Sequence, residues 1–133
     1  MVQTLITREK ISAHLNDDTH LGDGAELVFN GRVRNSEQGD PIIGIEYECY
    51  DGMAQKELQK LAEETAEKFQ ISDFNCIHRV GYVPIGEASL RVVIWSKHRV
   101  EGLDAVAWFI SEMKERVPIW KHAVLPDGSK LAQ

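Results

Sequence analysis

The segment from Met53 to Phe69 carries the most regular pattern in the sequence and restricts the fold more than any other feature. Small or apolar side chains recur there at intervals of three and four residues: Leu58, Leu61, Ala62, Thr65 and Phe69. Glutamate and lysine fill the opposite positions. This spacing is typical of an α-helix with one buried face. We therefore predict an amphipathic helix over 53–69 that packs against the rest of a folded domain.

Strand patterns lie on both sides of this helix. Residues 25–34 and 42–50 precede it, and residues 74–83 and 88–95 follow it. These runs are rich in β-branched and aromatic residues, and 42–50 shows the clearest period of two. Within each pair the connection is a short, turn-rich segment, too short for the crossover that parallel neighbours need. Both pairs are therefore predicted to be antiparallel.

Two further helices are predicted, one at each side of this central part. A short helix is expected from Arg8 to Leu15, with Thr7 as its N-cap. A long helix is expected over 99–117, and Pro118 would end it. Its apolar stripe is taken to be formed by Leu103, Val106, Ala107, Ile110 and Met113.

The C-terminal segment carries a turn signal, Pro126-Asp-Gly128, between two short extended arms. A small hairpin is predicted there. Together the elements indicate an α+β fold, with a mainly antiparallel sheet packed with helices and a small C-terminal hairpin. No repeat or linker divides the sequence, so we expect residues 1–133 to form a single domain.

Composition excludes several classes of function. The 133 residues include 43% hydrophobic and 27% charged residues, as in ordinary globular proteins, and the net charge of −6 argues against a nucleic-acid partner. No apolar run approaches the roughly 20 residues that cross a bilayer, and the first residues lack a signal peptide's apolar core. We therefore expect a cytoplasmic protein with no membrane partner.

Sequence motifs exclude other chemistry. Cys49 and Cys76 lack the spacing of metal ligands and are interpreted as buried thiols, so no metal and no cofactor are expected. The motifs of P-loop, dinucleotide, serine hydrolase and zinc protease sites are missing from the sequence. Glu46 and Glu48 share one face of their strand, which favours a charged outer face over an acid and base pair. His78 is interpreted as structural.

Two lysines stand out near the end of the long predicted helix. Lys114 follows Ile110 by four residues, on the face expected to point inward. Either its stem lies over apolar surface with the ammonium in water, or the ammonium faces a pocket. Lys121 comes directly after Pro118-Ile-Trp120, a stiff segment at the same helix end. Lys121 is therefore a candidate for the same cavity as Lys114.

Other cations lie at the ends of predicted strands. Lys97-His98-Arg99 stands where a strand gives way to the long helix, and free backbone N–H groups favour an anion such as phosphate there. A solvated basic turn is the alternative. Arg32 and Arg34 project from the same side of the first predicted strand. If these cations converge, the site is suited to a small polyanion.

Five stretches of the sequence share their order and spacing with one known family: Gly31-Arg-Val-Arg-Asn35, Glu46-Tyr-Glu-Cys-Tyr50, His78-Arg-Val-Gly81, Ser96-Lys-His-Arg99 and Lys114-Glu-Arg-Val-Pro-Ile-Trp-Lys121. The chain resembles the large, catalytic subunit of molybdopterin synthase from about residue 25 to residue 128. The resemblance implies an α/β-hammerhead-like fold. It also implies conversion of cyclic pyranopterin monophosphate (precursor Z) to molybdopterin by transfer of two sulfurs, a step of molybdenum cofactor biosynthesis.

The resemblance also implies partners and site residues. The sulfur donor is a small ubiquitin-like subunit with a thiocarboxylate on its C-terminal Gly-Gly, and two large subunits form a homodimer at the centre of a heterotetramer. Lys114 and Lys121 are similar to the family's two active-site lysines. The substrate-binding residues by the same resemblance are Arg34, His98, Arg99 and Phe29. His98 and Arg99 are expected to serve either their own site or the neighbouring chain's.

Two other functions stay open on the sequence alone. The chain would be a non-catalytic module if it docked a ubiquitin-like Gly-Gly partner without binding the pterin. It would be a small phosphate-ester enzyme if Glu46 or Glu48 acted as a general base. One departure from the family also bears on the fold, because Gly102 weakens the first turn of the long helix relative to alanine.

Overall fold

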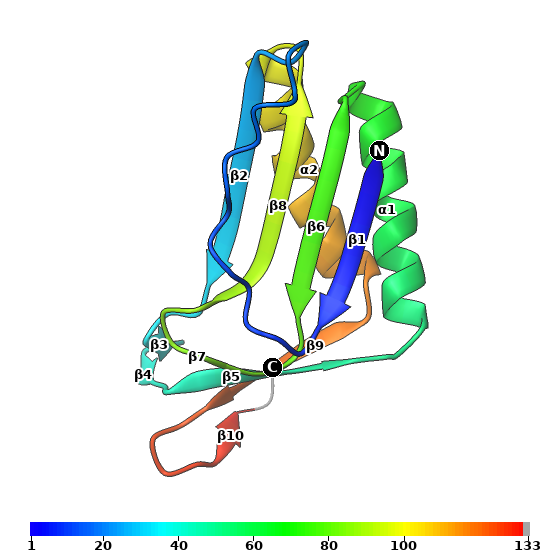
Figure 1. Ribbon diagram of the computed structural model, residues 1–133. Coiled ribbons are helices and arrows are strands. Elements are labelled where there is room, and N and C mark those ends of the chain that lie inside the picture. Colours follow the sequence, from blue (N-terminus) through cyan, green and yellow to red (C-terminus); the bar gives the residue numbers. More distant parts are fainter. Residues whose placement is uncertain (132–133) are drawn as a thin grey trace.

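The computed structural model describes residues 1–131. Two helices and ten strands make up this part of the chain (Figure 1): β1 (Val2–Thr7), β2 (Ala25–Arg32), β3 (Ser36–Glu37), β4 (Asp40–Pro41), β5 (Gly44–Cys49), α1 (Met53–Phe69), β6 (Asp73–Arg79), β7 (Gly81–Pro84), β8 (Ala88–Ser96), α2 (Arg99–Arg116), β9 (Ile119–Val124) and β10 (Lys130–Leu131). The predicted α+β class is confirmed. Neither of these helices is long and apolar enough to cross a membrane.

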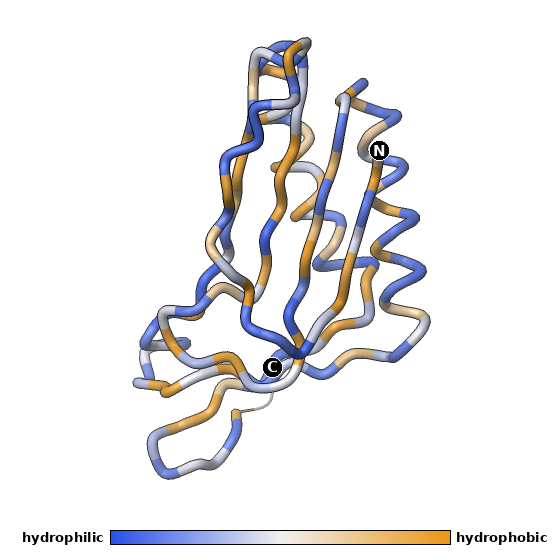
Figure 2. The backbone as a smooth tube through the Cα atoms, viewed as in Figure 1, coloured by the Kyte–Doolittle hydropathy of each residue, from blue (hydrophilic) through white to orange (hydrophobic). Residues whose placement is uncertain are grey.

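The main sheet has the strand order β1-β6-β8-β2, and both helices lie over one of its faces (Figure 1). Its two pairs that involve β8 are antiparallel, whereas β1 and β6 run parallel. Buried and partly exposed residues alternate along β6, as expected for a strand with one covered face, and Figure 2 shows hydrophobic and hydrophilic segments along the strands of this sheet. Phe74 of β6 is fully buried and meets Phe109 of α2 with ring centroids 4.8 Å apart. Burying such a side chain contributes about 1.5–3 kcal/mol.

Helix α1 has the bounds that the sequence predicts, Met53–Phe69. It buries Leu58, Leu61 and Thr65 against the sheet, as the spacing indicates. The helix ends at Gln70, which adopts the left-handed conformation and donates its backbone N–H to the carbonyl of Ala66.

The other long helix buries a face that differs in part from the predicted one. Its buried stripe consists of Gly102, Ala105, Phe109 and Met113, while Leu103 is 56% exposed. The predicted stripe is confirmed at Met113, and Val106 and Ile110 pack partly buried against the core, but Leu103 and Ala107 are exposed. Residues 103–110 are apolar on several faces, so spacing alone does not select one. Packing selects the face that contains Gly102.

Gly102 allows the start of α2 to approach β2 closely. A Cβ at this position would lie 2.7 Å from Oγ of Ser96 and nearer still to Cδ1 of Leu27. The glycine that lowers helix propensity is therefore required by the contact between helix and sheet.

A second sheet, of order β10-β9-β5-β7, crosses one end of the main sheet (Figure 1). It is antiparallel throughout and has its own small core, which includes Ile42, Ile45 and Val83. The predicted C-terminal hairpin is confirmed as β9 and β10, with Lys130 opposite Val124. The expected strand over 74–83 is divided between the two sheets, because Gly81 turns the chain with a φ of 84°.

The predicted helix from Arg8 to Leu15 is wrong. The chain before it forms β1, and residues 8–24 cross the open face of the main sheet without helical structure (Figure 1). Of its two expected apolar contacts, Ile11 is buried but Leu15 is 81% exposed. Arg91 of β8 holds the segment by donating to the carbonyl of Ser12. A single buried contact does not stabilise so short a helix.

Candidate functional site

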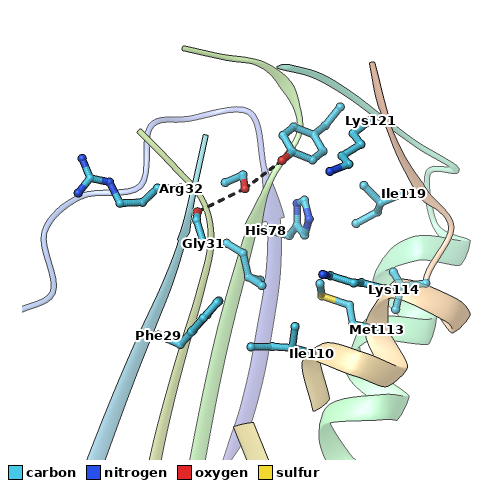
Figure 3. Close-up of a pocket in the computed structure, with 13 residues that line it drawn as sticks. Phe29, Gly31, Arg32, His78, Ile110, Met113, Lys114, Ile119 and Lys121 are labelled. Carbon is cyan, nitrogen blue, oxygen red and sulfur yellow. Dashed lines mark hydrogen bonds between the residues drawn. The ribbon is translucent and has the colours of Figure 1, made fainter. Parts of the chain in front are cut away.

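A cavity of about 430 Å³ lies where the main sheet, the end of α2 and the second sheet meet (Figure 3). Most of its wall is apolar, with a few polar side chains, which is the usual composition of a small-molecule site. The lining residues come from β2, β5, β6, β8, α2 and the segment after it: Phe29, Gly31, Arg32, Tyr47, His78, Ser89, Leu90, Ile110, Met113, Lys114, Val117, Ile119 and Lys121.

Both predicted lysines line this cavity, and both ammonium groups point into it (Figure 3). Lys114 stands in the last turn of α2, and Lys121 projects from β9. Lys121 is held opposite Tyr47 by the antiparallel pairing of β9 with β5. Two positive groups at one cavity attract an anionic ligand and stabilise negative charge that develops on it.

A carboxylate that the sequence analysis did not single out also reaches this site. Glu37 of β3 lies 3.7 Å from Nζ of Lys121, and its side chain is only 12% exposed. The same carboxylate lies 4.0 Å from the guanidinium of Arg34. Glu37 therefore connects Lys121 with the strand pair β3 and β4, although it is not itself among the lining residues.

The two arginines of the first strand do not both project into the site. β2 ends at Arg32, which lines the cavity but turns its guanidinium away from the lysines, toward the carbonyl of Gly86 at 2.7–3.0 Å (Figure 3). Arg34 lies beyond the strand, with a side chain 77% exposed, and is not among the lining residues. We predicted that Arg32 and Arg34 project from the same side because side chains alternate along a strand. β2 ends at Arg32, so this alternation does not extend to Arg34.

His98 and Arg99 lie at the opposite end of α2 from Lys114. His98 occupies the N-cap position, and its carbonyl accepts a hydrogen bond of 2.6 Å from Oγ of Ser96. At 1.5 Å per residue, roughly 20 Å of helix separate this end from Lys114. A single chain therefore does not bring His98 and Arg99 to the cavity, whereas Phe29 of β2 does line it.

One wall of the cavity is a polar network that the sequence analysis missed. Tyr47 donates its hydroxyl to Oγ of Ser89 at 3.2 Å, and Ser89 donates in turn to the carbonyl of Gly31 at 3.4 Å. Burial raises the pKa of Tyr47, so its hydroxyl keeps its proton. Beside it, His78 is buried and donates Nδ1–H to the carbonyl of Arg79. A signal for His78 was present, because it follows Phe74 and Cys76 on the inward face of β6.

The remaining candidates lie outside the cavity. Glu46 lies 4.0 Å from Lys130, and Glu48 lies 3.5 Å from His122, so neither carboxylate belongs to the lining. Burial raises the pKa of the Cys76 thiol, which makes this sulfur a poor nucleophile. Among residues 1–131, no group of three or more histidine, cysteine, aspartate or glutamate side chains is arranged to hold a metal ion.

The family of this chain is shown by a match to a known family model. The model described as MoaE protein matches residues 3–116. The chain belongs to the MoaE family. A relative from Pyrococcus abyssi, molybdopterin synthase catalytic subunit, is 39% identical over 105 residues, which cover 79% of this chain and 71% of the relative. The human protein of the same name is 37% identical over 106 residues, which cover 80% of this chain and 56% of the human protein.

Solved structures of the MoaE family share the fold. Molybdopterin synthase from Staphylococcus aureus has a TM-score of 0.82 and 33% identity, and the match covers 94% of this chain and 93% of that chain. A complex of subunits 1 and 2 of molybdopterin-converting factor from Helicobacter pylori has a TM-score of 0.71 and 21% identity, with 98% and 88% of the two chains covered. The architecture described above is therefore that of the MoaE family.

Proposed function

We propose that this MoaE family member is the catalytic subunit of a molybdopterin synthase. In this role it is a sulfurtransferase that converts cyclic pyranopterin monophosphate to molybdopterin with two sulfurs from the thiocarboxylate of a small ubiquitin-like subunit. The observation that carries the proposal is the meeting of Lys114 and Lys121 in one cavity of about 430 Å³. Relatives named molybdopterin synthase catalytic subunit support it, at 37–39% identity.

The two lysines have complementary tasks in this proposal. The cyclic phosphate of the substrate and the thiocarboxylate of the carrier are both anions, so each requires a positive partner. Lys121 stabilises charge that develops as sulfur attacks, and Lys114 binds the second anion and exchanges a proton with it. Phe29, Met113 and Ile110 give the wall apolar surface for the pterin ring.

The sulfur carrier reaches this cavity from outside the chain. An extended Gly-Gly tail has no bulky side chains, so it needs less space at the cavity than another peptide would. The thiocarboxylate at its end is then placed against the ammonium groups of Lys114 and Lys121. The carrier also explains why the site has no thiolate of its own: Cys76 is buried in the core, and Cys49 donates to Asp51 outside the cavity.

A homodimer completes the site in this proposal. β2 is an edge strand of the main sheet, and its Val28 and Phe29 are 41% and 37% exposed. Two copies placed antiparallel along β2 would bring the start of α2 in one chain to the cavity of the other. His98 and Arg99 would then bind the substrate phosphate at the partner's site, with Arg34 at the rim. One small subunit at each far end gives a heterotetramer.

The cellular setting follows from the same role. We propose that residues 1–133 act as one domain in the cytoplasm, where the pterin substrate and the carrier meet. The alternative of a non-catalytic docking module is weakened by the two lysines, because docking a tail requires only one positive group. It would replace the present proposal if the chain bound the carrier but not the pterin.

Reconstitution tests this function directly. The purified chain is mixed with a thiocarboxylated Gly-Gly carrier and cyclic pyranopterin monophosphate, and the dithiolene product is measured as its stable oxidised derivative. We expect product in proportion to thiocarboxylate, two sulfurs for each pterin. Carrier binding without product would contradict the enzyme assignment and support the docking module.

A further inference from the structure

His78 is a polar residue in an otherwise apolar position of the core. It follows Phe74 and Cys76 at intervals of two on the face of β6 that the helices cover. Only 5% of its surface is exposed, and it forms part of the cavity wall between the two lysines (Figure 3). A buried polar group costs free energy unless it is hydrogen-bonded.

One hydrogen bond fixes which nitrogen of the ring carries the proton. Nδ1 lies 2.8 Å from the carbonyl oxygen of Arg79. A carbonyl only accepts, so Nδ1 must donate, and in the neutral ring Nε2 then has a lone pair. Arg79 is itself anchored, since its Nη1 lies 2.7 Å from Glu87, which keeps this carbonyl in place. The ring is therefore held in one tautomer.

In the described residues 1–131, the hydrogen bond of this ring is made by Nδ1, which leaves Nε2 to meet the cavity that His78 lines. Nε2 is not among the fully buried side-chain nitrogens without a hydrogen-bond partner, which are Nε of Arg79 and Nε1 of Trp95. Tyr47 presents its ring to His78 with centroids 5.4 Å apart, and its hydroxyl is already directed to Ser89. Burial lowers the pKa of His78, which keeps the ring neutral.

The nitrogen Nε2 of His78 differs from the charged groups around it because it can accept a hydrogen bond. Lys114 of α2 and Lys121 of β9 line the same cavity, and both are donors only. Tyr47 of β5 and Arg32 of β2 are the other titratable residues that line the cavity within residues 1–131, and the guanidinium of Arg32 turns away toward the carbonyl of Gly86. The wall therefore offers ammonium groups for anions and one neutral nitrogen for a donor.

We propose that His78 is a substrate-binding residue whose Nε2 accepts a hydrogen bond from an N–H group of the substrate heterocycle. This inference rests on the proposed function and deepens it. The lysines hold the anionic groups, while His78 fixes the orientation of the uncharged ring between them. A ligand without that N–H forgoes this hydrogen bond, so the site favours heterocycles that carry the donor.

Equilibrium binding of cyclic pyranopterin monophosphate, measured by calorimetry without the carrier, tests this role. His78→Phe keeps a flat ring but removes the acceptor, and we expect its Kd to rise at least about tenfold. His78→Gln retains an accepting oxygen and should recover part of the affinity. His14→Gln, in the N-terminal segment outside the cavity, is the matched control and should bind as the parent does. Thermal unfolding confirms that each variant is folded.

The pH dependence separates a binding role from a structural one. Protonation of His78 would turn its acceptor into a donor and remove the proposed hydrogen bond. Burial holds the pKa of this ring below its usual value of 6.5, so binding by the parent should weaken as the pH falls through that lowered pKa, whereas His78→Gln should lack this acid limb. Equal affinity and equal pH profiles for parent, His78→Phe and His78→Gln would overturn the inference while leaving the proposed function intact. Failure of the parent to bind the pterin would overturn both.

Discussion

The ammonium nitrogen of Lys121 lies 3.7 Å from a carboxylate oxygen of Glu37. This contact joins the second sheet to the β3 and β4 strand pair and places a negative charge next to one of the two cavity lysines. Arg34 lies 4.0 Å from the same carboxylate, and it is not among the residues that line the cavity. Glu37 therefore competes with any anionic ligand for two positive groups.

Glu37→Gln should tighten the binding of the anionic substrate. The change removes one negative charge and leaves Lys121 and Arg34 free to attract phosphate. Because exposed ion pairs contribute about 0.2–1 kcal/mol, we expect the Kd to fall by about two- to fivefold, with a smaller change at high salt. Calorimetry at two ionic strengths measures both effects. Weaker binding by Glu37→Gln would show instead that Glu37 holds Lys121 in its working position.

Two inactive variants should restore activity to each other when they are mixed. One carries His98→Ala and Arg99→Ala, and the other carries Lys121→Ala. In a mixed dimer one of the two cavities combines intact Lys121 from one chain with intact His98 and Arg99 from the other. After random exchange about one quarter of all sites should be active. A mixture with no more activity than its components would show that no site is shared between chains.

Gly102→Ala should destabilise the fold even though alanine favours helices by about 1 kcal/mol. The new methyl group would lie 2.7 Å from Oγ of Ser96 and press on the side chain of Leu27. Overpacking of this kind costs typically about 1–3 kcal/mol, so a net loss of unfolding free energy is expected. Urea denaturation measures it, with the exposed Asp104→Ala in the same helix as a control. Stabilisation by Gly102→Ala would contradict the close contact described here.

Stability should depend on the protonation of His78. Burial holds the pKa of His78 in the folded protein below its usual value of 6.5. At a pH between the pKa of the folded protein and that of the unfolded chain, the unfolded chain therefore binds more protons than the folded protein. The folded state therefore loses stability as the pH falls below about 6.5, down through the lower pKa of the folded protein. The difference between parent and His78→Gln isolates this effect from the other histidines. A parent that gains stability relative to His78→Gln on acidification would contradict the neutral ring.

Local sequence patterns predicted helix α1 but not the buried face of helix α2. Met53–Phe69 has one clearly apolar face, so its helix and its buried residues were both predictable. The buried stripe of α2 was not, because Val106, Trp108 and Ile110 make neighbouring faces similarly apolar. The choice between them depends on the close contact of Gly102 with β2, which lies far away in the sequence.

The candidate site was predictable only in part for the same reason. Spacing alone left Lys114 between solvent and a pocket, and the family resemblance implied the active site. Its long side chain reaches the cavity from the edge of the buried face. Glu37 meets Lys121 across 84 positions of sequence, and no local pattern encodes such a contact. His78 was interpreted as structural, yet its place after Phe74 and Cys76 already indicated a buried, inward-facing ring.

A single-turnover assay with matched lysine variants tests the central claim most directly. The parent, Lys114→Ala, Lys121→Ala and the exposed α1 control Lys60→Ala are each mixed with thiocarboxylated carrier and cyclic pyranopterin monophosphate. We expect the parent and Lys60→Ala to form the dithiolene product at the same rate. Each cavity lysine variant should be slower by about 10²-fold or more while remaining folded. Normal product formation by both Lys114→Ala and Lys121→Ala would contradict the account.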